Sequence, residues 1–332
     1  MDDEPRSVKV LLPGLLLLVG FGVAAELSVS VLGWGTPLIF AVLFGAVLSN
    51  TYGVPKSLEP GVDTYKLLLE IGIVLLGASI SLSDVIDAGP RILGLTLAVV
   101  AFGILLVEFL ARYVFGLSGR APALLATGSS ICGVSAVLAV AGTIDASEND
   151  IAYATATILV FDALTLVTFP IAGSVLDMSS VAFGIWSGLS MFSTGPVAAA
   201  GFAHSQTAGE WATLTKLTRN SLIGLVVLTY SFSYSLGSDK RTSPRTFWNQ
   251  FPKFLIGFFL VAAIANFPGI STGFVDTVEM ISDWLFVLAF VGLGCEIQAK
   301  NLRQTGIRPF LTVLLYLLIM ATASFLVVQT IF

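Results

Sequence analysis

Charge is the scarcest property of this sequence. Only 11% of its 332 residues are Asp, Glu, Lys or Arg, whereas 56% are hydrophobic. A soluble domain carries about 25% charged residues, so this composition excludes an ordinary soluble protein. The basic residues form no cluster of the kind that binds nucleic acid, and we expect no nucleic-acid partner.

Cysteine and histidine are nearly absent. Cys132 and Cys295 both lie in apolar stretches, and His204 is the single histidine. Two cysteines in apolar stretches indicate no disulfide framework. One histidine excludes bis-histidine haem ligation and makes a histidine-rich zinc site untenable. No nucleophile–base pair appears either, so we expect no enzymatic activity, no metal and no cofactor.

Long apolar runs fill the chain instead. Each is near the length of about 20 residues that crosses a hydrocarbon core as a helix. The sequence therefore predicts an all-α, polytopic membrane protein, a single integral domain over residues 1–332. Two segments, 34–50 and 179–202, are short or rich in Gly, Ser and Pro, and whether they cross fully stays open. The eleven predicted segments are 9–30, 34–50, 66–82, 91–116, 121–142, 150–177, 179–202, 209–236, 251–268, 277–297 and 308–331.

The basic residues predict an orientation, because Lys and Arg favour the cytoplasmic side of a membrane. With the N-terminus inside and eleven crossings, 13 of the 16 basic residues fall inside; the exceptions are Arg91, Lys216 and Arg219. This bias predicts a cytoplasmic N-terminus, an external C-terminus and a location in the cell membrane.

One internal repeat is visible. LGASISLSDVIDAGPR (residues 76–91) and LGCEIQAKNLRQTGIR (residues 293–308) share five of sixteen positions. Seven segments separate the copies, and this odd number predicts that they are inverted. Inverted repeats with discontinuous helices are typical of secondary transporters. We expect approximate repeats over residues 66–177 and 209–332.

Two stretches carry unusually many small polar residues for a membrane segment, ATGSSICGVSAV (126–137) and GLSMFSTGPVAAAGFAHS (188–205). Small residues let neighbouring helices pack closely, which is one interpretation. The other is that each helix is interrupted, near Gly128–Gly133 and at Gly195–Pro196. Freed N–H groups at such a break would bind an anion.

Lys216 and Arg219, in TLTKLTRNS (213–221), are three residues apart and share a helix face. Cations near hydrocarbon mark functional sites unless they extend to the membrane surface, and both interpretations stand. Asp162 lies near the middle of its segment. It is either a coupling group for protons or sodium, or the counter-ion of Lys216 or Arg219.

These motifs resemble a prokaryotic membrane-protein family of proposed sulfate exporters. TGSSICGVSA (127–136) matches the family pattern T-G-x-S-I-C-G-x-S-A, and the K-L-T-R pattern is intact at 216–219. In a second pattern, Phe192 and Pro196 stand where the family has His and Gln. The resemblance implies a fold like that of bile acid symporters and cation/proton antiporters, with crossed discontinuous helices.

The sequence thus predicts a secondary transporter of a small anion such as sulfate, sulfite or a sulfonate. The alternative is a cation/proton antiporter that uses buried carboxylates. Expected partners are the anion, the lipid bilayer and a proton or sodium as coupling ion, and a homodimer is left open. Asp162 is the coupling candidate, and the predicted binding residues are Ser129, Ser130, Cys132, Gly133, Ser135, Ser190, Ser193, Lys216 and Arg219.

Overall fold

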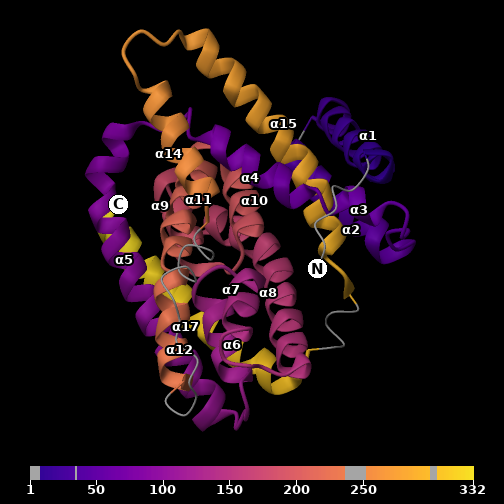
Figure 1. Cartoon of the computed structure of the whole chain (residues 1–332). Helices are drawn as coiled ribbons and strands as arrows, with labels where there is room; N and C mark the ends of the chain where they lie inside the picture. Colours follow the sequence, from indigo (N-terminus) through magenta and orange to yellow (C-terminus); the bar gives the residue numbers. More distant parts are fainter. Residues whose placement is uncertain (1–7, 34–35, 236–251, 300–304) are drawn as a thin grey trace. The chain divides into compact units, whose positions relative to one another are not determined.

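The computed structural model describes residues 8–33, 36–235, 252–299 and 305–332 (Figure 1). All regular structure in these ranges is helical. Each of the eleven predicted segments contains one helix or two consecutive helices. Within the described ranges, five helical stretches are long and apolar enough to cross a membrane: Lys9–Leu32, Val85–Val114, Glu148–Val175, Thr272–Glu296 and Ile307–Ile331. A helical, multi-pass membrane protein is confirmed, and the count of eleven crossings stays a prediction.

Serine side chains mark several helix starts. A helix leaves its first N–H groups without partners, and a serine at the N-cap accepts a hydrogen bond from one of them. Ser147 accepts from the Asp150 amide at 3.1 Å, and Ser205 accepts from the Ala208 amide at 3.1 Å. These caps fix where α8 (Glu148–Val175) and α11 (Gln206–Ser221) begin.

The chain divides into two compact units, and the single integral domain stays a prediction. Unit 1 comprises Met1–Leu82 and Phe254–Ala299, so two distant parts of the chain build it. Glycine lets two of its helices pack closely. A Cβ added at Gly45 would lie only 2.9 Å from the Cys295 amide nitrogen, so a larger residue would not fit there. Its helices are α1 (Val8–Leu32), α2 (Pro37–Thr51), α3 (Glu59–Val62), α4 (Tyr65–Leu76), α14 (Phe254–Ala265) and α15 (Thr272–Glu296).

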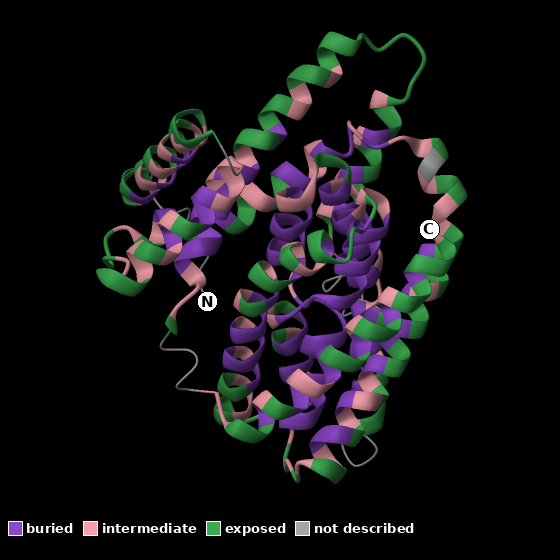
Figure 2. Ribbon diagram, turned by 180° about the vertical axis from the view of Figure 1, so that it is seen from behind, coloured by how far each residue is buried: buried purple, intermediate pink, exposed green. Residues whose placement is uncertain are grey.

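Unit 2 comprises Ser83–Lys253 and Lys300–Phe332. Small residues let its inner helices approach, because an added Cβ at Gly188 would lie 2.6 Å from Thr215 Cβ. Buried residues concentrate in these inner helices (Figure 2). Besides α8 and α11, its elements are α5 (Leu82–Phe109), the π-helix η1 (Leu110–Val114), α6 (Ala121–Ser130), α7 (Val134–Ala141), α9 (Ser180–Ser190), α10 (Thr194–His204), α12 (Ile223–Ser235) and α17 (Ile307–Ile331).

The outer helices expose large apolar side chains. Leu105 on α5 is 69% exposed and Val175 on α8 is 78% exposed. Surfaces of this kind suit contact with lipid, where an apolar side chain needs no partner in the protein. Unit 2 also contains most of the buried polar side chains of the described residues.

Candidate functional site

Two helices of unit 2 are interrupted. Residues Ile131–Gly133 separate α6 from α7, and residues Met191–Ser193 separate α9 from α10. The predicted break near Gly128–Gly133 is therefore present. The second break comes before the predicted Gly195–Pro196, and Pro196 lies in the first turn of α10. A proline is tolerated there, because its missing N–H would have had no partner in the helix.

Gly133 allows the two breaks to meet. Its backbone has φ +68° and ψ −135°, a conformation that favours glycine. An added Cβ would collide with the Ser193 hydroxyl oxygen. The breaks at Gly133 and Ser193 are consequently in direct contact, and no larger residue fits at position 133.

Arg219 binds the carbonyl ends of α6 and α9, which are the first halves of the two interrupted helices. Its Nε donates to the Ser130 carbonyl at 3.2 Å, and Nη2 donates to the Ser129 carbonyl at 3.0 Å. The last carbonyls of a helix have no partner in that helix, and a cation suits their negative dipole end. Nη1 completes the set on α9, with carbonyls of Gly188 at 3.0 Å, Leu189 at 2.7 Å and Met191 at 2.8 Å.

Lys216, one helical turn before Arg219 on α11, contacts the same two breaks. Its Nζ donates to the carbonyls of Ile131 at 2.7 Å and Met191 at 3.1 Å. Lys216 and Arg219 are both 0% exposed, so neither extends to the membrane surface. The sequence predicts an anion between the 128–135 break and these cations. In the structure, backbone carbonyls of the protein are the direct partners of both cations, at the position predicted for the anion.

The second halves of the interrupted helices, α7 and α10, begin at amide ends whose contacts differ from those of the carbonyl ends. Asp162 on α8 accepts hydrogen bonds from the Ser193 N–H at 2.9 Å and the Ser193 hydroxyl at 2.5 Å. The carboxylate thereby caps the positive end of α10. It also attracts the Lys216 ammonium through space. Both sequence interpretations of Asp162, counter-ion and coupling group, fit this position.

Exposure separates the two kinds of helix end. The carbonyl ends of α6 and α9 are buried with the cations, whereas Ser193 and Thr194 are half-buried and Ser135 is exposed. The first N–H groups of α7 and α10, which have no partners within their helices, therefore lie near the protein surface. The amide ends are therefore more exposed than the carbonyl ends that hold Lys216 and Arg219.

The buried charges do not cancel. Among the described residues, the buried charged side chains are Lys216, Arg219 and Asp162, two cations and one anion. The positive dipole ends of α7 and α10 are offset by the negative dipole ends of α6 and α9, so the excess lies on the side chains. The site therefore carries an excess of one positive charge when all three side chains are ionised.

The remaining predicted residues divide by position. Ser129 and Ser130 are buried and use their carbonyls for Arg219, and the Ser129 carbonyl also accepts from the Tyr316 hydroxyl at 3.1 Å. The Ser190 hydroxyl shares a 2.7 Å hydrogen bond with that of Ser324 on α17. Ser190 therefore contacts α17 rather than the amide ends. Cys132 lies within the first break and is buried, with 9% exposure.

Asn220 and Thr194 belong to the site but escaped the sequence prediction. Asn220 Nδ2 donates to the Thr194 hydroxyl at 2.9 Å, and the buried Asn220 Oδ1 has no hydrogen-bond partner within the described structure. A signal was present, since Asn220 is four residues after Lys216 and shares its helix face.

Phe192, at the position where the resemblance predicts a histidine, lies among aromatic side chains. It is 0% exposed and lies 5.8 Å from Phe161 and 6.2 Å from Tyr316, measured between ring centroids. Edge and tilted ring contacts of this length are favourable. Phe192 is thus a residue of the break that belongs to an aromatic cluster.

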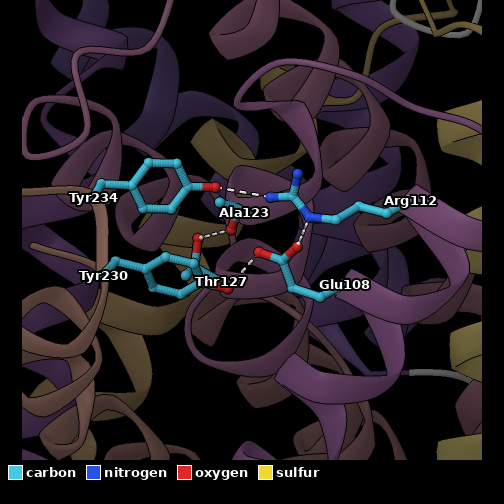
Figure 3. A network of polar contacts seen from close by, with 6 residues as sticks. All are labelled: Glu108, Arg112, Ala123, Thr127, Tyr230 and Tyr234. Carbon is cyan, nitrogen blue, oxygen red and sulfur yellow. Dashed lines mark hydrogen bonds and ion pairs between the residues drawn. The ribbon is translucent and has the colours of Figure 1, made fainter. Parts of the chain in front are cut away.

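A second polar network anchors the start of α6 (Figure 3). Glu108 pairs with Arg112 and accepts from the Tyr230 hydroxyl at 3.0 Å. Arg112 also donates to the Tyr234 hydroxyl at 2.8 Å, and the Arg120 guanidinium lies 4.3 Å from the Tyr234 ring centroid. The network ties η1, α12 and the residue preceding α6 together.

Within the described residues, no group of three or more His, Cys, Asp or Glu side chains could hold a metal ion.

The family model described as conserved hypothetical protein 698 matches residues 13–313. The chain is 31% identical to a UPF0324 membrane protein of Nitratidesulfovibrio vulgaris, over 92% of this chain and 89% of that protein. It is 30% identical to UPF0324 membrane protein Atu0671 of Agrobacterium fabrum, over 96% and 93%. No solved structure matches.

Proposed function

The chain belongs to the family of conserved hypothetical protein 698, whose relatives are named membrane proteins, and we propose that it is a secondary transporter of a small anion. The proposed substrates are sulfate, sulfite or a sulfonate, carried by alternating access across the cell membrane with the N-terminus in the cytoplasm. Binding and translocation require no covalent chemistry and no cofactor.

The excess of positive charge beside two accessible amide ends carries this proposal. An anion seated there gains from the dipole of α7 and from the two cations behind it, whereas Asp162 already caps α10. Ser135, Thr194 and Asn220 provide polar side chains at or next to this position. A single negative charge balances the site, which favours a monovalent sulfonate or hydrogen sulfite over a fully ionised sulfate.

Lys216 and Arg219 support the site indirectly in this account. They satisfy the carbonyl ends, hold the two breaks together and supply the positive potential. The anion itself binds amide N–H groups and hydroxyls, which are neutral donors. Neutral donors suit a transporter, because the substrate must also leave the site.

Equilibrium binding of radiolabelled sulfite to purified protein tests this site. We expect Ser135→Ala and Asn220→Ala each to weaken binding about tenfold, because a hydrogen bond to a charged group contributes about 1.5–3 kcal/mol. Thr143→Val is the matched control: Thr143 lies just past the opposite end of α7, and its hydroxyl donates to the Ala139 carbonyl at 3.1 Å. Unchanged affinity in both site variants would refute this position.

A cation/proton antiporter is the second candidate, and Asp162 favours it. A buried carboxylate beside an unpartnered amide oxygen on Asn220 offers ligands for a small cation. Proteoliposomes distinguish the two candidates. A sodium gradient that changes the internal pH without anion flux would favour the antiporter, and anion flux without sodium would favour the anion carrier.

A further inference from the structure

Asn50 clamps the end of α15. Its side-chain Nδ2 donates to the Ala46 carbonyl of its own helix at 2.8 Å and to the Ile297 carbonyl at 2.6 Å. Its Oδ1 accepts from the Ala299 N–H at 2.8 Å. One asparagine therefore holds the backbone on both sides of a single residue, position 298, where the chain leaves α15.

Asn266 makes the same set of bonds at the end of α4. Its Nδ2 donates to the Ala262 carbonyl, also four residues earlier, at 2.9 Å, and to the Ile80 carbonyl at 2.9 Å. Its Oδ1 accepts from the Leu82 N–H at 3.3 Å. The residue enclosed here is at position 81, where the chain leaves α4.

The two clamps are equivalent in register. In the internal repeat, Ile80 and Leu82 align with Ile297 and Ala299, the backbone partners of the two asparagines. A second pair of contacts keeps the register. An added Cβ at Gly77 would lie 3.2 Å from the Ala262 nitrogen, and one at the aligned Gly294 would lie 3.0 Å from the Ala46 nitrogen. Ala46 and Ala262 each precede their asparagine by four residues.

Such exchanged contacts are those of a two-fold axis, in which each copy binds the other in the same way. The copies are α2 with α4, and α14 with α15. The equivalent helices α4 and α15 run antiparallel: Tyr65 lies at Gly292, whereas Gly72, seven residues later, lies at Leu285. Antiparallel equivalent helices place the two clamped ends at opposite ends of unit 1.

Each clamped segment is also a boundary. Unit 1 ends at Leu82 and at Ala299, the residues whose N–H groups Asn266 and Asn50 hold. We propose that Asn50 and Asn266 are matched clamps that fix the two pivots about which the units move during transport. Hinges are commonly a few residues at the ends of elements, and these segments fit that description. The pivot role rests on the proposed function; the clamps and the two-fold relation do not.

Amide hydrogen exchange of the full chain in nanodiscs tests the clamps. Asn50→Ala should raise the exchange rate of the Ala299 amide by about two- to tenfold and leave the Leu82 amide unchanged. Asn266→Ala should do the reverse. Asn149→Ala, an exposed asparagine in the first turn of α8, is the matched control and should change neither amide. Loss of protection at neither amide, or at both in each variant, would overturn the clamps.

The proposed pivots are tested by measuring from which side of the membrane an introduced cysteine can be labelled. A cysteine introduced by Ser135→Cys in proteoliposomes is labelled with a membrane-impermeant thiol reagent from each side in turn. Because the clamps lie at opposite ends, Asn50→Ala and Asn266→Ala should shift the ratio of the two labelling rates in opposite directions, by about two- to tenfold. Shifts in the same direction, or none, would overturn the pivots. This assay uses no anion, so absence of sulfite flux in the same vesicles would instead count against the proposed function.

Discussion

Arg219 is the residue with the most demanding role in unit 2. It is wholly buried and donates to five backbone carbonyls from two helices. Its planar fork of donors matches that task, whereas a lysine is a compact charge with a different geometry. Arg219 therefore determines the shape of both breaks as well as their charge.

We predict that Arg219→Lys destabilises the protein by about 3 kcal/mol, because several buried carbonyls lose their partners while the charge remains. Thermal unfolding in detergent measures the change. Arg91→Lys, at an exposed position on α5, is the control and should unfold like the wild type. An Arg219→Lys protein as stable as the control would contradict the capping role.

Gly133→Ala should be similarly harmful. The substitution forces a side chain into a left-handed conformation, which costs about 1–3 kcal/mol, and places it against the Ser193 hydroxyl. Gly94→Ala on α5 is the control, since an added Cβ there meets nothing within 4 Å. It should be stabilising by up to about 1 kcal/mol. A Gly133→Ala protein at least as stable as wild type would show that the break is formed differently.

At the scale of single residues, the sequence indicated some residues of the site but not the groups that they contact. Lys216 and Arg219 stood out because they violate the charge bias of the chain. Their partners could not be predicted, because backbone carbonyls carry no residue-specific signal. The partner of Ser190 could not be predicted either, because the sequence does not show that its hydroxyl pairs with that of Ser324, 134 residues later.

At the scale of the elements, the paired interruptions position the site. Glycine and serine content predicted both interruptions, although the second lies a few residues earlier than expected. The sequence could not show that the two breaks touch, because this depends on the packing of α9 and α11 through Gly184 and Gly188. Tertiary packing of small residues is not visible in local periodicity.

The network around Tyr234 provides a prediction for α12. Tyr234→Phe removes the hydrogen bond to Arg112 but keeps the ring under Arg120, and should cost about 1 kcal/mol. Tyr234→Ala removes both contacts and should cost more, as measured by thermal unfolding. Tyr113→Phe, 79% exposed, is the control. Equal stability of the two Tyr234 variants would show that the Arg120 contact contributes nothing.

At the scale of the whole molecule, unit 1 is built from two parts of the sequence that are far apart. The chain leaves it after Leu82 and returns at Phe254. No linker composition marks the first of these points, because the membrane imposes the same apolar pattern on both units. The inverted repeat stays a prediction, and the contacts of Asn50 and Asn266 follow the alignment of its five matched positions.

The charge bias makes a further prediction at this scale. With an odd number of crossings, the two termini lie on opposite sides of the membrane, and the N-terminus lies inside. A fluorescent protein that matures only in the cytoplasm should be bright when fused before Met1 and dark when fused after Phe332. Bright fusions at both ends would contradict the odd count.

Uptake of radiolabelled sulfite into proteoliposomes tests whether the protein transports an anion. We predict saturable uptake above that of protein-free vesicles, reduced about tenfold by Ser135→Ala and by Asn220→Ala and unchanged by Thr143→Val. Absence of uptake for sulfite, sulfate and an organic sulfonate alike, in vesicles where a sodium gradient still drives a change in pH, would contradict it.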